Sequence, residues 1–110
     1  MAQTTLAILG AGVWGRTLGE LAGSNGHRVR FWSRSGGESL PGVISAAEIL
    51  LSAVSMKGVR PMVEQVRGLP LSNEAIIVTA TKGLDPETTL TPSQIWQQAF
   101  PDRPVVVLAG

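Results

Sequence analysis

The segment Thr5–Trp32 decides the fold, and it reads TLAILGAGVWGRTLGELAGSNGHRVRFW. A short apolar run at residues 5–9 stops at a glycine, which predicts a buried strand. Residues 13–24 carry apolar side chains at near-helical spacing and are followed by a glycine that can end a helix. Polar and apolar residues alternate over 27–32, which predicts a second strand. A strand, a glycine turn, a helix and a strand within about 30 residues make a βαβ unit.

The rest of the chain continues this alternation. Residues 33–45 are rich in Ser, Gly and Pro, which predicts a loop with little regular structure. Further strands are expected at 49–54, 75–79 and 105–108, and further helices at about 59–67 and 92–99. Apolar strands that alternate with helices are typical of a parallel sheet covered on both faces. The sequence therefore predicts an α/β fold, a Rossmann-type parallel sheet with helices on both faces, in a single domain of residues 1–110.

Composition narrows the classes of function. Hydrophobic residues make up 44% of the chain and charged residues 15%, which indicates a globular protein. A formal net charge of +1 and the absence of Lys/Arg runs argue against nucleic-acid binding. The chain has no cysteine, no acidic and histidine residues at metal-ligand spacing, no signal peptide and no apolar stretch near the ~20 residues that span a bilayer. We expect a cytoplasmic protein with neither a metal nor a membrane partner.

The glycine turn carries the chemistry. Gly10, Gly12 and Gly15 form a G-x-G-x-x-G pattern after a strand and before a helix. In this context Gly10 permits the tight turn, Gly12 lets the backbone approach a pyrophosphate, and Gly15 allows close packing of the helix on the strand. The free N–H groups at the start of the helix favour phosphate binding. The pattern predicts a dinucleotide-binding site.

The end of the second strand bears on cofactor preference. A site selective for NAD has an acidic residue about 20 positions after the glycines, which binds the ribose hydroxyls. Here Ser33, Arg34 and Ser35 stand at that point, and the first acidic residue is Glu38. Arg34 can pair bidentately with a 2′-phosphate, and the two serines can donate hydrogen bonds to it. We therefore expect NADP as cofactor, with NADPH preferred and NAD as the second choice. The alternative is that Arg34 is a solvated loop residue.

Three motifs in this order resemble the bacterial type of NAD(P)-dependent glycerol-3-phosphate dehydrogenase. They are the glycine turn at 10–15 with its tryptophan, the strand end FWSR at 31–34, and the turn TKGL at 81–84. The segment 52–60 takes the place of that family's AVPS…VR segment. Gly110 would open a Gly-Pro-Ser-like turn. The resemblance spans the whole chain.

The resemblance implies reduction of dihydroxyacetone phosphate to sn-glycerol 3-phosphate for glycerophospholipid synthesis. By the family pattern Val13, Trp14 and Arg34 would contact NADP(H), Lys82 would reach both cofactor and substrate, and Gly110 would contact substrate. The family's proton-donating lysine belongs to a C-terminal helical domain, so we expect the chain to be truncated before that domain and to bind cofactor without turnover. The resemblance leaves a homodimer open.

Several features depart from the family or stay ambiguous. The stretch 35–46 is shorter than the family's loop, and Ser55 follows Val54 without the usual proline. Lys57 follows a strand end, where it can either contact a ligand or be a solvated helix residue. The alternative for Lys82 is an ordinary loop lysine. Two functions of other kinds also remain: a β-hydroxyacid dehydrogenase of the 6-phosphogluconate type, and a stand-alone NADP-binding module that senses or regulates.

Three other residues are assigned structural roles. His27 is expected at a surface turn, because no neighbouring carboxylate in the sequence would orient it as a base. Trp96, with apolar neighbours on a predicted helix, is expected to pack in the core. Asp85 flanks a proline and is expected to belong to a turn.

Overall fold

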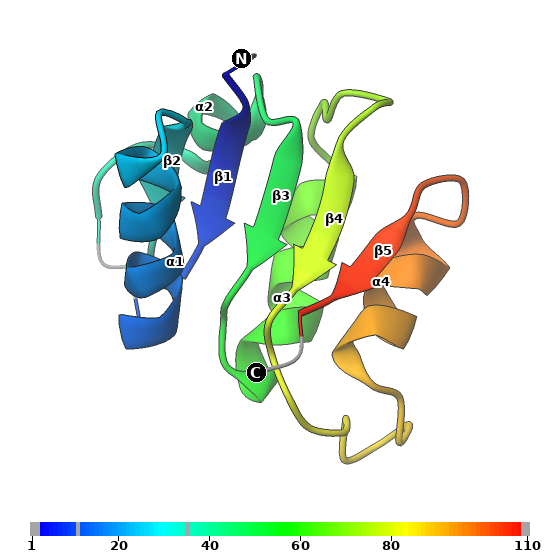
Figure 1. Ribbon diagram of the computed structural model, residues 1–110. Helices are drawn as coiled ribbons and strands as arrows, with labels where there is room; N and C mark the ends of the chain where they lie inside the picture. Colours follow the sequence, from blue (N-terminus) through cyan, green and yellow to red (C-terminus); the bar gives the residue numbers. More distant parts are fainter. Residues whose placement is uncertain (1–2, 11, 35, 109–110) are drawn as a thin grey trace.

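Five parallel strands form one sheet in the computed structural model, which describes residues 3–10, 12–34 and 36–108. The order across the sheet is β2-β1-β3-β4-β5 (Figure 1). The chain begins in an inner strand, β1, adds β2 on one side, and then crosses back to add β3, β4 and β5 on the other side. The strands are β1 Thr5–Leu9, β2 Arg28–Trp32, β3 Ile49–Ser52, β4 Ile76–Thr79 and β5 Val105–Val107. Every neighbouring pair is parallel.

Helices cover both faces of the sheet, as the sequence predicts. In chain order they are α1 Val13–Ser24, α2 Leu40–Ile44, α3 Met56–Arg67 and α4 Pro92–Ala99. Figure 1 shows α1 on one face, over β1 and β2, and the other three helices on the opposite face. The Rossmann-type prediction is confirmed. None of the helices in the described part of the chain is long and apolar enough to cross a bilayer.

The prediction of a loop without regular structure at 33–45 is wrong for its second half. Ser39 caps the short helix α2, since its Oγ accepts a hydrogen bond from the Gly42 N–H at 3.2 Å. The helix buries Leu40, Val43 and Ile44 against the sheet. A proline near a helix start needs no N–H partner there, so Pro41 is compatible with this helix.

Helix α3 begins three residues earlier than the sequence predicts, at Met56 and not at Val59. Pro61 lies inside it and cannot donate the hydrogen bond that the Lys57 carbonyl would otherwise accept. An interior proline usually ends or kinks a helix. Burial of Val59, Met62, Val63 and Val66 along one side of α3 offsets this cost.

The remaining boundaries differ by one or two residues. The second strand begins at Arg28, and the third, fourth and fifth span 49–52, 76–79 and 105–107. Helices α1 and α4 have the predicted bounds. Differences of this size lie within the ordinary fraying of element ends.

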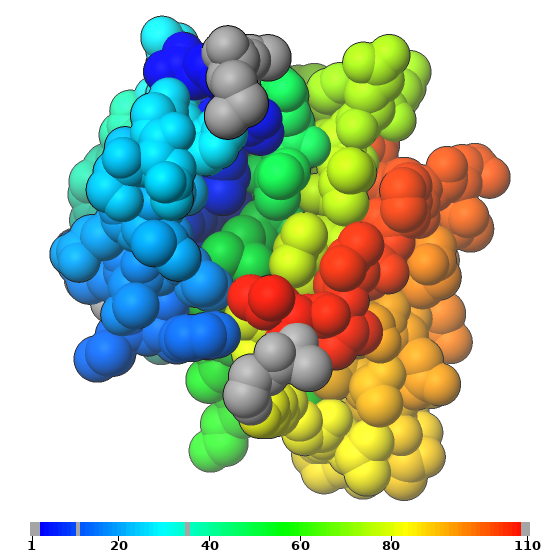
Figure 2. All heavy atoms as spheres, in the orientation of Figure 1, coloured from blue at the N-terminus to red at the C-terminus, as the bar shows by residue number. Residues whose placement is uncertain are grey.

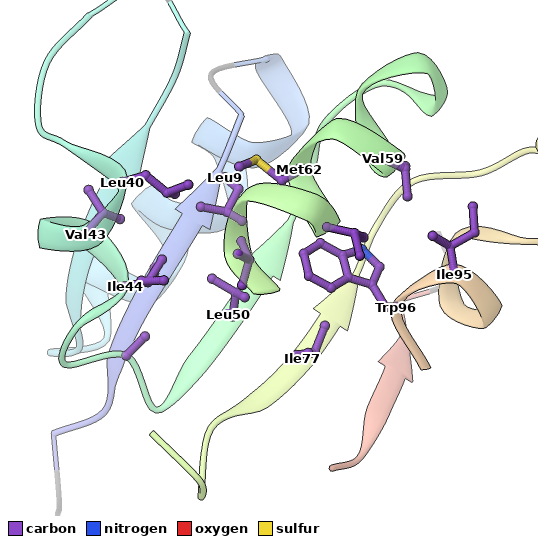
Figure 3. Packing of buried hydrophobic residues seen from close by; sticks show 14 residues of the cluster. Leu9, Leu40, Val43, Ile44, Leu50, Val59, Met62, Ile77, Ile95 and Trp96 are labelled. Carbon is purple, nitrogen blue, oxygen red and sulfur yellow. The ribbon is translucent and has the colours of Figure 1, made fainter. Parts of the chain in front are cut away.

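The main core lies between the sheet and the helices α2, α3 and α4. Figure 3 shows Leu50 and Ile77 of the sheet facing Met62 and Trp96 of the helices. Trp96 is fully buried, and its ring lies 6.0 Å from that of Phe100. The prediction that Trp96 packs in the core is confirmed.

The α1 face of the sheet is only partly covered. Figure 2 shows α1 over the β1 and β2 side, whereas atoms of β4 and β5 reach the surface. Ile76 and Val106 on these strands are 37% and 47% exposed. On this face, no described helix covers β4 and β5.

Candidate functional site

All five strands end together at one edge of the sheet. Backbone hydrogen bonds continue just past the strand ends, from the Gly10 N–H to the Trp32 carbonyl at 2.8 Å and from the Ala53 N–H to the Leu9 carbonyl at 2.9 Å. The Ala80 and Leu108 N–H groups make equivalent bonds across β3–β4 and β4–β5. Open α/β sheets bind ligands outside the carboxyl ends of their strands, where the strand order reverses. This edge of the sheet is therefore where a ligand site is expected.

Gly10 is required by the backbone itself. Its φ angle of +106° lies in a region that other residues rarely adopt. A Cβ there would also lie 2.9 Å from the Ala53 carbonyl oxygen, and real Cβ atoms essentially never come that close to another heavy atom. The turn after β1 can therefore be this tight only with glycine at position 10.

Gly12 has a different reason to be glycine. Its backbone is extended, with φ −73° and ψ 171°, so any residue could adopt its conformation. A Cβ at this position would meet nothing in the protein within 4 Å. Gly12 begins α1, and no side chain caps the helix start there. The glycine thus keeps the first-turn N–H groups open to a ligand that approaches from outside.

Helix α1 lies against the sheet through two further glycines. A Cβ at Gly15 would come within 3.2 Å of the Ala53 Cβ and the Gly10 carbonyl oxygen. A Cβ at Gly19 would lie only 2.3 Å from Cζ of Phe31. The role of Gly15 was predicted from the sequence and that of Gly19 was not, although its position one helical turn further along was a signal for a glycine stripe.

A cleft of about 660 Å³ opens beside the glycine turn. We call it the glycine-turn cleft. Its lining comes from the turn after β1, the end of β2, the segment after β3 and one side of α3, namely Gly10, Gly12, Trp32, Ser33, Arg34, Ala53, Val54, Ser55, Lys57, Gly58, Pro61, Met62 and Gln65. The structure thus brings together four predicted site residues: Gly10, Gly12, Ser33 and Arg34. Two of the described lining residues are cations and none is acidic.

The acidic residue nearest in sequence to Arg34 is held elsewhere. Glu38 forms an ion pair with Arg30, and Arg30 also donates to the Gly42 carbonyl at 2.8 Å. The hydrogen bond from Arg30 lowers the pKa of the Glu38 carboxyl below its usual value. Ser33 donates to the Gly36 carbonyl at 3.5 Å in the turn after β2. Ser35 lies outside the described residues, so its predicted contact is not placed.

Lys82 lies at a separate, smaller hollow of about 320 Å³. This Lys82 hollow is lined by Trp14, Ala80, Lys82 and Leu108. Trp14 and Val13 at the start of α1 are 45% and 85% exposed. Six predicted site residues therefore divide between two hollows, four in the glycine-turn cleft and two in the Lys82 hollow, whereas Val13 and Gly15 line neither.

The turn that carries Lys82 is fixed on both sides. Thr81 Oγ1 donates a hydrogen bond to the Val54 carbonyl. Gly83 has φ +128°, and a Cβ there would lie 3.2 Å from Sδ of Met56. Contacts to the segment after β3 therefore determine the path of the turn after β4.

An ion pair that the sequence did not predict anchors the next part of this loop to α3. Arg60 Nε lies 3.2 Å from Asp85 Oδ1, and its Nη2 donates to Thr88 Oγ1 at 2.9 Å. Asp85 also accepts from the Thr88 N–H at 3.0 Å, which confirms its predicted place in a turn. The hydrogen bond from Arg60, followed by that from Thr88, lowers the pKa of Asp85 to about 2. Arg60 and Asp85 are 25 residues apart in the sequence, and no local sequence pattern predicts their contact.

Two further predictions concern His27 and Gly110. His27 is half-buried and its Nδ1 accepts a hydrogen bond from the Thr4 N–H at 3.1 Å, which gives it a structural role at the helix-to-strand turn. Gly110 lies outside the described residues. Among residues 3–10, 12–34 and 36–108, no group of three or more metal-ligating side chains is assembled.

Comparison with known proteins decides the family. The model of the NAD-dependent glycerol-3-phosphate dehydrogenase N-terminus matches residues 5–40 and 36–110. The chain belongs to this family. The glycerol-3-phosphate dehydrogenase family was predicted from the three motifs, and that prediction is confirmed.

Relatives of known name agree with the assignment to glycerol-3-phosphate dehydrogenases. A protein of Nostoc named glycerol-3-phosphate dehydrogenase [NAD(P)+] is 60% identical over the whole chain, and one of Trichormus variabilis with the same name is 59% identical. The chain spans 36% of the length of each of these relatives. The crystal structure of the Coxiella burnetii glycerol-3-phosphate dehydrogenase matches 98% of this chain and 41% of its own, with a TM-score of 0.89 at 20% identity. That likeness shows the same fold.

Proposed function

We propose that residues 1–110 form the NAD(P)-binding domain of a glycerol-3-phosphate dehydrogenase. The enzyme reduces dihydroxyacetone phosphate to sn-glycerol 3-phosphate with NAD(P)H and supplies glycerophospholipid synthesis. Family membership supports this proposal. The observation that carries it is Gly12, whose missing Cβ leaves open space at an uncapped helix start beside the glycine-turn cleft.

The cofactor pyrophosphate binds at the start of α1. The first-turn N–H groups donate to the phosphate oxygens, and the positive end of the helix dipole stabilises their charge. No acidic residue lies in the first turn of α1 to oppose this. Gly10 and Gly15 position the turn and the helix so that these donors converge on one place.

Arg34 and Ser33 bind the 2′-phosphate of NADPH. The two side chains stand directly after β2, where the adenosine ribose lies in folds of this class. A guanidinium pairs well with a phosphate, whereas a carboxylate would repel it. Because Glu38 is engaged by Arg30, it does not serve as the ribose-binding acid of an NAD-selective site. NADPH is therefore preferred over NADH.

Lys82 acts at the substrate end. The Lys82 hollow lies beyond the carboxyl end of β4, and Trp14 at the start of α1 forms part of its lining. The bound nicotinamide supplies the hydride for the reduction. The Lys82 ammonium holds the substrate oxygens beside it and stabilises the negative charge that develops on the carbonyl oxygen. By the family pattern, Gly110 contacts the substrate.

The proton donor lies outside residues 1–110. The relatives are almost three times as long as this chain, so we assign the residues that complete the reaction to their remaining length. Residues 1–110 alone bind cofactor without turnover. A cytoplasmic location and assembly into a homodimer belong to the same proposal.

A fluorescence titration tests the proposal. Of the chain's tryptophans, Trp32 lines the glycine-turn cleft and Trp14 the Lys82 hollow, so bound dinucleotide should quench their emission. We expect saturable binding of NADPH that is tighter than binding of NADH. Arg34→Ala should reduce the preference for NADPH while leaving NADH binding unchanged. Tighter binding of NADH by the unaltered chain would refute the 2′-phosphate assignment, and the absence of binding to either would refute the proposed function.

A further inference from the structure

The second cation of the glycine-turn cleft comes from a different element than Arg34. Lys57 lies in the first turn of α3, whereas Arg34 comes from the turn after β2. Both line the same cleft, with Ala53 and Val54 of the segment after β3 also in the lining. A cleft of about 660 Å³ is of the size that holds a single small-molecule ligand. The two cations therefore line one cleft of ligand size.

Neither cation is paired with an acidic residue in the part of the chain that the structure describes. Elsewhere on the surface Arg30 pairs with Glu38, Arg60 with Asp85 and Arg67 with Glu64. Within the described residues, Arg34 and Lys57 form no such pair, and the described lining of their cleft contains no carboxylate. Two like charges share one cleft at a cost in repulsion, which a bound anion would remove.

The position of Lys57 in its helix adds to this cost. Lys57 is the second residue of α3, where the positive end of the helix dipole disfavours a cation. No acidic residue stands in the first turn, and the Ser55 side chain does not cap the helix. The local field is therefore positive and already suited to an anion before any ligand arrives.

We propose that Lys57 is a specificity-determining residue that binds the 2′-phosphate of the adenosine ribose together with Arg34. This inference rests on the proposed function. The pyrophosphate already has its donors at the start of α1, whereas Lys57 lines the same cleft as Ser33 and Arg34 at the end of β2, where the ribose lies. A phosphate monoester carries close to two negative charges at neutral pH, so it can accept from a guanidinium on one side and an ammonium on the other.

The test compares four chains by titration with NADPH and NADH at low ionic strength, where exposed charges are least screened. They are the unaltered chain, Lys57→Ala, the conservative Lys57→Arg and the control Arg28→Ala. Arg28 is exposed at the start of β2, at the opposite edge of the sheet, so its removal reproduces the change in net charge alone.

We expect Lys57→Ala to weaken NADPH binding by about tenfold while NADH binding stays within about twofold. Lys57→Arg should retain most of the NADPH affinity, and Arg28→Ala should behave as the unaltered chain. The melting temperature of Lys57→Ala should not be lower than that of the unaltered chain, because the lysine charge interacts unfavourably with the positive end of the helix dipole.

Three results would overturn the inference, and they differ from one another. Unchanged NADPH affinity in Lys57→Ala, with normal binding by the unaltered chain, removes Lys57 from the site and leaves the proposed function intact. An equal loss for NADPH and NADH places Lys57 at the pyrophosphate and refutes its role in specificity. Failure of the unaltered chain to bind either dinucleotide refutes the proposed function and this inference with it.

Discussion

Two glycines separated by one residue should respond to the same substitution in opposite ways. In Gly10→Ala the new Cβ would lie 2.9 Å from a backbone oxygen and 3.0 Å from its carbonyl carbon, at a φ of +106°. The left-handed backbone costs about 1–2 kcal/mol and overpacking about 1–3 kcal/mol. We therefore expect a loss of roughly 2–5 kcal/mol, a large part of the ~5–15 kcal/mol that stabilises a typical domain.

Gly12→Ala should leave stability almost unchanged. The backbone there is extended and the new Cβ would meet no protein atom within 4 Å. Alanine is a poorer helix N-cap than glycine by a few tenths of a kcal/mol to about 1 kcal/mol, and the lower entropy of the unfolded chain returns ~0.4–1 kcal/mol. NADPH affinity, in contrast, should fall by about tenfold or more, because the methyl group occupies the path of the pyrophosphate.

Urea unfolding followed by circular dichroism, paired with NADPH titration, measures both effects. We expect low stability in Gly10→Ala, and normal stability with impaired binding in Gly12→Ala. If Gly12→Ala bound NADPH as tightly as the unaltered chain, the open space at Gly12 would have no role in binding. If Gly10→Ala were as stable as the unaltered chain, the contact argument at the turn would be wrong.

Two further predictions concern stability. The pKa of Asp85 is lowered to about 2 by Arg60, from an ordinary value of 3.8, so the pair stabilises the fold fully above pH 3.8 and progressively less as the pH falls towards 2. Asp85→Asn should therefore make the melting temperature fall less steeply as the pH is lowered from 3.8 towards 2. The control is Glu20→Gln, which removes an exposed carboxylate. An equally steep fall in Asp85→Asn and in this control would contradict the prediction. The buried Thr79 hydroxyl has no hydrogen-bond partner among the described residues. Thr79→Val should therefore raise the free energy of unfolding, measured by urea unfolding, by about 1 kcal/mol. A clear decrease in that free energy would show that the hydroxyl does have a hydrogen-bond partner.

The sequence predicted the sheet, α1 and α4 well because their signals are local. Continuous apolar strands, the glycine turn and the Thr91 capping box with Gln94 are all contained within a few residues. The same holds for the places of Gly10 and Arg34 in the cleft lining, which follow from their positions at strand ends. Local sequence patterns therefore predict most of one wall of the glycine-turn cleft.

What the sequence did not predict depends on contacts between distant segments or on breakers overruled by packing. Helix α2 lies in a Gly, Ser and Pro-rich stretch, and α3 contains Gly58 and Pro61. In both helices, burial of apolar side chains outweighs poor helix propensity. The pairing of Arg60 with Asp85 joins α3 to the loop after β4. The placement of Lys57 in the same cleft as Arg34 likewise depends on the packing of α3, which no local pattern specifies.

The central claim is that a dinucleotide binds at the carboxyl edge of the sheet, across the glycine-turn cleft. Amide chemical-shift mapping of the ¹⁵N-labelled chain during NADPH titration tests this most directly. We predict that the largest shifts fall on Gly12 and Val13, on Ser33 and Arg34, and on Lys57, with little change at the opposite edge of the sheet. Saturable shifts confined to other parts of the chain, or no shifts at NADPH concentrations well above those of cellular cofactors, would contradict the account.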